Sequence, residues 1–280
     1  MRRVPRTLPL LLTLLVLAAS QASAQSVSDV VEGMYESYEA QAEGVDNYTL
    51  VQTMMGFEST SYFEKEVVDG RPVFRMRGGS AQAANFNVGL GGDESGLGDV
   101  YEIGPELIEH ARYAGREDVN GREAHVLAID DLSQVGFAQE TTPEDMDFEP
   151  RNGRIYVDTD MMIPSRIEFV GDATTDNGVN EVTVRIDLQD IRDIEGLLIP
   201  FSTHMEITGL QAMLDPETRA QLEEMEQQLA SLPPEQREMM ERMMGQQLEQ
   251  LRQMASGGDD LMSMDVTVTD VRVNDGPPSE

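Results

Sequence analysis

The sequence lacks cysteine and tryptophan, and Lys65 is its single lysine among 280 residues. Without cysteine the chain cannot form disulfides, thiolate metal sites or a cysteine nucleophile, and it cannot carry a lipid on an N-terminal cysteine. Any lysine-dependent chemistry would have only Lys65 to use. The absence of tryptophan and an aromatic content of 5% disfavour a sugar-binding surface.

Basic residues are also scarce, because 20 Lys and Arg stand against 52 Asp and Glu, giving a formal charge of −32. Nucleic acid and anionic membrane surfaces repel such a chain, so we expect neither as a partner. The hydrophobic content of 40% is nevertheless enough for a core, which argues against disorder along the full length.

Motifs for catalysis and for metal or phosphate binding are missing. His110, His125 and His204 lie far apart, and none belongs to a two-histidine zinc spacing. There is no G-x-S-x-G nucleophile elbow, and the glycine-rich stretch 89–98 lacks the Lys-Ser/Thr pair of a phosphate-binding loop. We therefore expect a protein that is not an enzyme and has no cofactor or metal, although paired carboxylates for glycoside chemistry stay open on sequence alone.

Two pairs of acidic residues could contact a cation. Asp158 and Asp160 flank a predicted turn, and Asp130 and Asp131 are adjacent. Acidic side chains at the end of a hairpin are usually solvated, and this is the simpler interpretation of both pairs.

The first 24 residues have the layout of a secretory signal peptide. Three arginines lie within residues 2–6, an apolar segment covers residues 8–19, and Ala-Ser-Ala at 22–24 fits the cleavage rule. The apolar segment is short for a membrane span, and no later run of about 18 apolar residues follows. We expect cleavage after Ala24, a periplasmic location and no transmembrane segment in the mature chain; the alternative is an uncleaved anchor.

An amphipathic helix is predicted over residues 27–43, with Ser28 or Asp29 as its N-terminal cap. Its apolar face comprises Val27, Val30, Val31, Met34, Tyr35 and Tyr38. A shorter helix is predicted to begin at Gly104 and to end near His110.

Most of the remaining chain has the period-two alternation of strands, with hairpin turns such as Asp69-Gly70 and Asn120-Gly121. The predicted strands cover residues 48–57, 61–68, 72–77, 112–118, 123–129, 154–158, 163–170, 181–188, 199–207 and 262–273. A shift of phase between Val268 and Val271 indicates a bulge in the last strand. The pattern predicts an antiparallel meander with one covered face.

Three segments depart from this pattern. Residues 78–98 are rich in glycine and residues 136–152 are acidic, and both are predicted to be loops. Residues 211–256 are rich in Gln, Glu and Met and are predicted to form a helical hairpin inserted before the last strand. We treat residues 25–280 as a single domain, with a disordered tail at about 275–280.

The helical hairpin has a methionine-rich second helix, with methionines at 239, 240, 243 and 244. Methionine adapts to hydrophobic partners of varying shape, so Met239, Met240, Met243 and Met244 could form a lid or a docking element. The alternative is that they only hold the two helices together.

Three stretches resemble the LolA-like proteins, a family of bacterial periplasmic proteins that sort outer-membrane lipoproteins. They are YFEK at 62–65 with VDGRP at 68–72, IYVDTD at 155–160 with IPSRI at 163–167, and DIRDIEGLLIPF at 190–201. The resemblance spans about residues 27–209 and 261–273. It implies a mainly β, α+β fold in which a curved, half-open antiparallel barrel is covered by helices. The helical hairpin and the strong acidity depart from the family pattern.

The resemblance implies a carrier that binds lipoprotein acyl chains or other lipids in an apolar hollow and delivers them toward the outer membrane, with protein partners at both membranes. The side chains expected to line this hollow, or simply to form the core, are Phe63, Phe74, Ile167, Phe169, Val184, Ile186, Phe201 and Met205. One alternative is a non-enzymatic sensor or regulatory module that binds a protein partner through the helical hairpin. Another is a structural protein with a filled barrel that oligomerises through the same hairpin.

Overall fold

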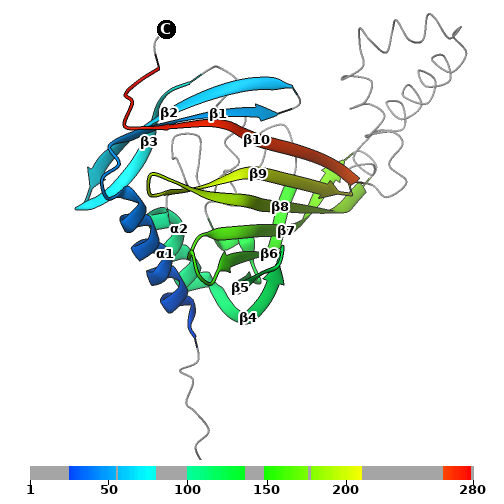
Figure 1. Cartoon of the computed structure of the whole chain (residues 1–280). Helices are drawn as coiled ribbons and strands as arrows, with labels where there is room; N and C mark the ends of the chain where they lie inside the picture. The colour runs from blue at the N-terminus through cyan, green and yellow to red at the C-terminus, as the bar shows by residue number, and fades with distance from the viewer. Residues whose placement is uncertain are drawn as a thin grey trace, which may run out of the picture.

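The computed structural model describes residues 25–54, 56–79, 100–135, 148–175, 178–209 and 261–278. Outside them lie the predicted signal peptide, most of the two segments predicted to be loops, and the predicted helical hairpin with Met239, Met240, Met243 and Met244. The described residues form two α-helices, a short 3-10 helix and ten strands (Figure 1).

The helices are α1 (Val27–Ala42), α2 (Val100–His110) and the 3-10 helix η2 (Leu132–Gln134). The strands are β1 (Asn47–Met54), β2 (Phe57–Val68), β3 (Arg71–Gly79), β4 (Ala111–Val119), β5 (Arg122–Ile129), β6 (Phe148–Asp158), β7 (Pro164–Thr175), β8 (Gly178–Ile194), β9 (Leu197–Thr208) and β10 (Leu261–Val273). They form one sheet in the order β3-β2-β1-β10-β9-β8-β7-β6-β5-β4.

The sheet consists of two meanders joined by the last strand. Strands β1–β3 form one meander and β4–β9 the other, and β10 pairs antiparallel with both β1 and β9. In the described chain the edge strands β3 and β4 do not pair, so the sheet curves without closing (Figure 1). The predicted fold class, a curved and half-open antiparallel sheet covered by helices, is confirmed.

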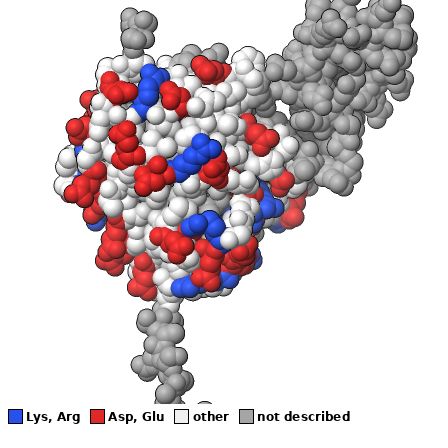
Figure 2. Space-filling model, in the orientation of Figure 1, with Lys and Arg blue, Asp and Glu red and all other residues white. Residues whose placement is uncertain are grey.

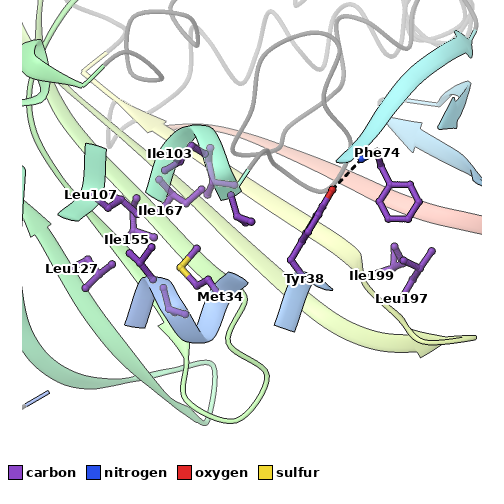
Figure 3. Close-up of a cluster of buried hydrophobic side chains, with 14 of the residues drawn as sticks. Met34, Tyr38, Phe74, Ile103, Leu107, Leu127, Ile155, Ile167, Leu197 and Ile199 are labelled. Atoms are coloured by element: carbon purple, nitrogen blue, oxygen red, sulfur yellow. Dashed lines mark hydrogen bonds between the residues drawn. The ribbon is translucent and has the colours of Figure 1, made fainter. Parts of the chain in front are cut away.

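Both helices cover the same side of the sheet, which we call the inner face; it carries side chains such as Tyr48, Ile155 and Ile199. The buried side of α1 packs on this face through Val30, Val31, Met34, Tyr38 and Ala42. Figure 3 shows Met34 beside Leu127 and Ile155, and the Tyr38 hydroxyl pointing at the backbone of Phe74. The predicted apolar stripe of the first helix is therefore the stripe that builds the core.

The bulge predicted in the last strand is also present. Val51 of β1 pairs with Asp270, and its neighbour Gln52 pairs with Val268, so Thr269 is an extra residue in β10. The Thr269 hydroxyl donates a hydrogen bond to the carbonyl of Val51 at 3.2 Å. The bulge keeps Val268 and Val273 both buried on the inner face, despite their odd spacing.

Several element boundaries differ from prediction, and two of the differences have a clear physical reason. Helix α2 begins at Val100 rather than Gly104 and has Pro105 inside it, because Val100, Ile103 and Leu107 form one buried stripe. Strand β6 begins at Phe148, within the predicted acidic loop, and includes Pro150. That proline is tolerated because it lies at a register shift and beyond the residues that pair with β5.

The N-terminal cap of α1 is Ser26, so the assignment of Ser28 or Asp29 as the cap was wrong. The Ser26 hydroxyl accepts a hydrogen bond from the Asp29 backbone N–H at 3.2 Å, and the Asp29 carboxylate accepts one from the Ser26 N–H at 2.8 Å. Asp29 is thus the reciprocal partner in a capping box, three residues after the cap.

We expect Ser26→Ala to lower the free energy of unfolding by about 1 kcal/mol, because the substitution leaves a helix N–H without its acceptor. Urea unfolding followed by circular dichroism measures this effect. Ser28→Ala is the control and should change stability by less than about 0.5 kcal/mol, since Ser28 is exposed within the first turn. A larger loss for Ser28→Ala than for Ser26→Ala would contradict the assignment.

Candidate lipid-binding face

The eight side chains predicted to line a hollow all belong to one cluster on the inner face. Phe63, Phe74, Ile167, Phe169 and Ile186 are buried in it, and Val184, Phe201 and Met205 are partly buried against it. They come from β2, β3, β7, β8 and β9, which the register aligns across the sheet. The structure therefore brings the predicted residues together; their role as ligand contacts stays a prediction.

The part of this cluster beneath the helices is a packed core. Tyr48 stacks on Phe63 with ring centroids 4.7 Å apart, and Phe74 lies edge-on to Tyr48 at 5.1 Å. The Tyr38 hydroxyl accepts a hydrogen bond from the Phe74 N–H at 3.1 Å, which fixes α1 to the edge strand β3 (Figure 3). Phe63 and Phe74 are each about 1% exposed, so these two residues are part of the packed core.

The far ends of the central strands lie beyond α1. Helix α1 contacts the start of β9, where the Gln41 amide oxygen accepts a hydrogen bond from the Leu198 N–H at 3.0 Å. Met205 is seven residues further along β9, which corresponds to about 23 Å of strand. Met205, with Val184 on β8, points to the inner face but remains partly exposed. The sheet thus presents apolar side chains that are not fully covered.

Phe201 lies between these two regions and has a cation beside it. The guanidinium carbon of Arg192 is 4.0 Å from the centroid of the Phe201 ring, a cation–π contact. Arg192 also donates through Nε to the Asp190 carboxylate at 3.1 Å. This contact was not predicted from sequence, because Arg192 and Phe201 meet only through the β8–β9 register.

The outer face of the sheet has a different chemistry. Arg154, Glu168, Arg185 and Glu206 lie directly opposite one another on β6, β7, β8 and β9, so charges of opposite sign alternate across four strands. Asp187 is buried beside them and accepts hydrogen bonds from Nε of Arg166 at 2.6 Å and Nε of Arg185 at 2.9 Å. Figure 2 shows basic side chains next to acidic ones rather than in a separate patch.

Asp158 is not solvated, which corrects the interpretation of the first acidic pair. Its carboxylate is about 1% exposed, pairs with Arg122 and accepts hydrogen bonds from the N–H groups of Asp160 and Met161 at 2.9 and 2.8 Å. Burial alone would raise the pKa of Asp158, but these hydrogen bonds hold it below the ordinary value. Asp160 is exposed, as predicted.

The second acidic pair is exposed but has structural partners. Asp130 pairs with Arg112 at 3.1 Å. Asp131 caps the short helix η2, because its carboxylate accepts hydrogen bonds from the backbone N–H and hydroxyl of Ser133 at 3.1 and 2.6 Å. Within the described ranges, no group of three or more His, Asp or Glu side chains is placed to hold a metal ion.

The pKa values of two histidines are shifted in opposite directions from the ordinary value of 6.5. Asp265 accepts a hydrogen bond from His204 Nδ1 at 2.7 Å, which raises the pKa of His204 above 6.5 despite partial burial, and Glu206 acts in the same sense from 3.3 Å. Burial of His125 lowers its pKa below 6.5. His204 therefore stabilises the fold fully below about pH 6.5 and loses this effect as pH rises through its folded pKa. The contribution of His125 is lost as pH falls below about 6.5.

Proton NMR titration of the histidine ring signals tests this expectation. His204 should titrate above 6.5 and His125 below it. Asp265→Asn should move the His204 midpoint downward and leave His125 unchanged, because Asp265 contacts only the former. A His204 midpoint that Asp265→Asn does not lower would show that this carboxylate does not hold the proton.

Sequence reasoning missed polar side chains on the inner face. Ser59 and Ser61 on β2 share the face of Phe63, and Thr203 on β9 shares the face of Phe201 and Met205. The signal was available in the alternation of β2, where serine occupies two successive inner positions before Phe63. It could not be recognised because the predicted strand began only at Ser61.

None of the described helices is long and apolar enough to cross a membrane. No protein-family model matches the sequence, and comparison with curated proteins finds no match.

Several solved structures are similar to the chain. A DUF1329 family protein from Desulfovibrio piger is 11% identical, with a TM-score of 0.39, over 90% of this chain and 93% of that one. A domain from Vibrio parahaemolyticus described as outer membrane lipoprotein-sorting is 10% identical, with a TM-score of 0.39, over 90% and 95% of the two chains. The Mycobacterium tuberculosis lipoprotein LppX is 12% identical, with a TM-score of 0.21, over 50% and 86%.

A domain described as lipoprotein-sorting is thus among the similar structures. The identities of 10–12% and the TM-scores below 0.5 are too low to transfer a function to this chain.

Proposed function

We propose that this protein is a periplasmic carrier that holds the acyl chains of lipoproteins or other lipids against the inner face of its sheet. The observation that carries the proposal is the row of inner-face apolar side chains beyond α1. Met205 and Val184 are apolar and lie on the helix-covered side, yet they remain partly exposed. An acyl chain laid along this row would remove both its own surface and theirs from water.

The free energy available from such binding is large. Each buried methylene contributes roughly 0.8 kcal/mol, so about a dozen methylenes contribute on the order of 10 kcal/mol before the entropic cost of association. No polar contact is required for tight binding on this scale. Met264 of β10 is directly opposite Met205. The flexible thioethers of these two residues would let the same surface pack against chains of different shape.

Transfer would then proceed by relative affinity. The cargo leaves when a receptor binds it more tightly, and no nucleotide or metal acts at this chain. Delivery toward the outer membrane requires protein partners on both sides, one to load the carrier and one to receive the cargo.

Native mass spectrometry of the mature protein purified from its own periplasm, with organic extraction of the same sample, tests the proposal. We expect a bound lipid or acylated peptide, whose mass identifies the cargo. A mass corresponding to the chain alone, unchanged after incubation with a diacylated lipopeptide and with phospholipid vesicles, would overturn the carrier function. The protein-binding module would then be the better explanation.

A further inference from the structure

The described chain contains nine buried polar or charged side chains, and they divide into two groups. Five have hydrogen-bond partners, namely Gln41, His125, Asp158, Ser165 and Asp187. The other four, Thr49, Ser59, Ser61 and Thr203, have no side-chain hydrogen bond in the described structure. Three of these four lie on the inner face. Buried polar groups normally find a partner, so this concentration on one face needs an explanation.

The register places these hydroxyls on one band of the inner face, where they are almost fully buried. Ser59 is directly opposite Gln52 of β1, and Ser61 is opposite Leu50. Thr203 is on β9, directly opposite Val266 of the neighbouring strand β10. Ser59 is 3% exposed, and Ser61 and Thr203 are each 8% exposed. Hydroxyl and amide groups are therefore set among apolar neighbours on the surface where we propose that acyl chains bind.

The surroundings specify the charge of a suitable ligand. Lys65 already pairs with Asp46 at 3.2 Å, and Arg192 pairs with Asp190. Lys65 shares the face of Ser59 and Ser61 on β2, and Arg192 lies on the inner face beside Phe201. Because both are already paired with a carboxylate, neither is left to neutralise an added one. An ionised free fatty acid would bring an uncompensated charge to this surface, whereas a neutral ester carbonyl or hydroxyl would only require hydrogen bonds.

We infer that Ser59, Ser61 and Gln52, with Thr203 across the sheet, form a polar strip that recognises the neutral ester region of an acylated glycerol and selects esterified acyl chains over free fatty acids. This inference rests on the proposed carrier function and narrows it to a substrate class. The same chemistry occurs in a free glycerolipid and in the diacylglyceryl group of a lipoprotein, so the probes must distinguish these two sources.

The test measures the binding of four probes by the full mature chain: dioleoylglycerol, its ether-linked analogue without ester carbonyls, oleic acid and a synthetic diacylated lipopeptide. The wild-type protein should bind the two ester-containing classes more tightly than the ether analogue and oleic acid. A preference for the lipopeptide over dioleoylglycerol would identify the lipoprotein as the source, and the reverse would identify a free glycerolipid. Either preference supports the polar strip.

The double variant Ser59→Ala/Ser61→Ala should weaken ester binding by about tenfold and leave binding of the ether analogue unchanged, because it removes two hydrogen-bond donors from an otherwise apolar surface. Its ligand-free form should unfold at the same denaturant concentration as wild type or at a higher one, because a buried methyl group needs no partner. Reduced binding together with reduced stability would indicate a merely structural role and would overturn the inference.

Two controls separate the strip from general effects. Thr60→Val lies between the two serines on the outer face and should change no affinity. Ser59→Thr keeps a hydroxyl and should retain the preference for esters. Equal affinity for ester and ether probes in wild type would overturn the inference while leaving the carrier function intact. Failure of all four probes to bind would overturn the carrier function itself, and the inference with it.

Discussion

Met205→Asp is expected to abolish lipid binding and to leave the protein folded. Met205 is partly exposed on the inner face, between Ile186 on β8 and Met264 on β10. A carboxylate at this position stays hydrated in the free protein but loses its water when an acyl chain covers it. Among the described residues, the inner-face neighbours directly opposite Met205 are apolar and offer no basic side chain. We expect the affinity for a diacylated lipopeptide to fall by roughly 100-fold or more, measured by native mass spectrometry or fluorescent lipid displacement.

The matched control is Ser202→Asp, which adds the same charge three positions away on the opposite face of β9. It should bind lipid like the wild type, and Met205→Leu should do so as well. Phe201→Asp would be a less decisive variant, because the Arg192 guanidinium carbon lies 4.0 Å from the centroid of that ring and could pair with the new carboxylate. Normal lipid binding by a folded Met205→Asp protein would remove this part of the inner face from the site.

Asp158→Ala is expected to cause the largest loss of stability, about 3 kcal/mol in the free energy of unfolding. The substitution removes a buried carboxylate that pairs with Arg122 and leaves the N–H groups of Asp160 and Met161 without their acceptor. The turn concerned also holds α1, because the Ser37 hydroxyl donates to the Met161 carbonyl at 2.7 Å. Urea unfolding at pH 7 gives the value, and Asp160→Ala, which removes an exposed neighbour, should cost less than about 1 kcal/mol.

The acid dependence of the same site has a defined sign. The pKa of Asp158 is lowered in the folded protein, so its stabilisation is complete above its ordinary value of 3.8 and is lost as pH falls through the folded pKa. The stability difference between wild type and Asp158→Asn should therefore shrink as the pH is lowered from 5 toward 2. A difference that stays constant over this range would show that Asp158 is not ionised in the native state.

Local pattern predicted much of this fold, because hairpins are encoded by neighbouring residues. Asp69-Gly70 and Asn120-Gly121 form the turns expected of them, with left-handed backbone at all four residues. The alternation in β8 and β9 correctly placed Val184, Ile186, Phe201 and Met205 on one face. The phase shift between Val268 and Val271 predicted a bulge in the last strand, and the structure places it at Thr269.

Features that depend on distant partners could not be predicted in this way. The burial of Asp158 depends on Arg122, which lies 36 residues away, and a turn-end aspartate without such a partner would be solvated. The contact of Arg192 with Phe201 depends on the register of two long strands. That Ser59 and Ser61 have no side-chain hydrogen bond within the described ranges could not be predicted either, because it depends on which polar groups the fold brings near them.

The interior position of β10 has a consequence for how the chain folds. Until residues 261–273 are available, β1 and β9 each lack a neighbour, and the two meanders have no strand to join them. Pairing β10 with β1 closes a loop of more than 200 residues, a contact of very long sequence separation, and such contacts slow folding. We expect refolding to proceed through a species with two separate half-sheets whose unpaired edges are prone to aggregation. If the predicted signal peptide directs export, slow joining of the two halves would extend the time in which the chain can cross the membrane unfolded.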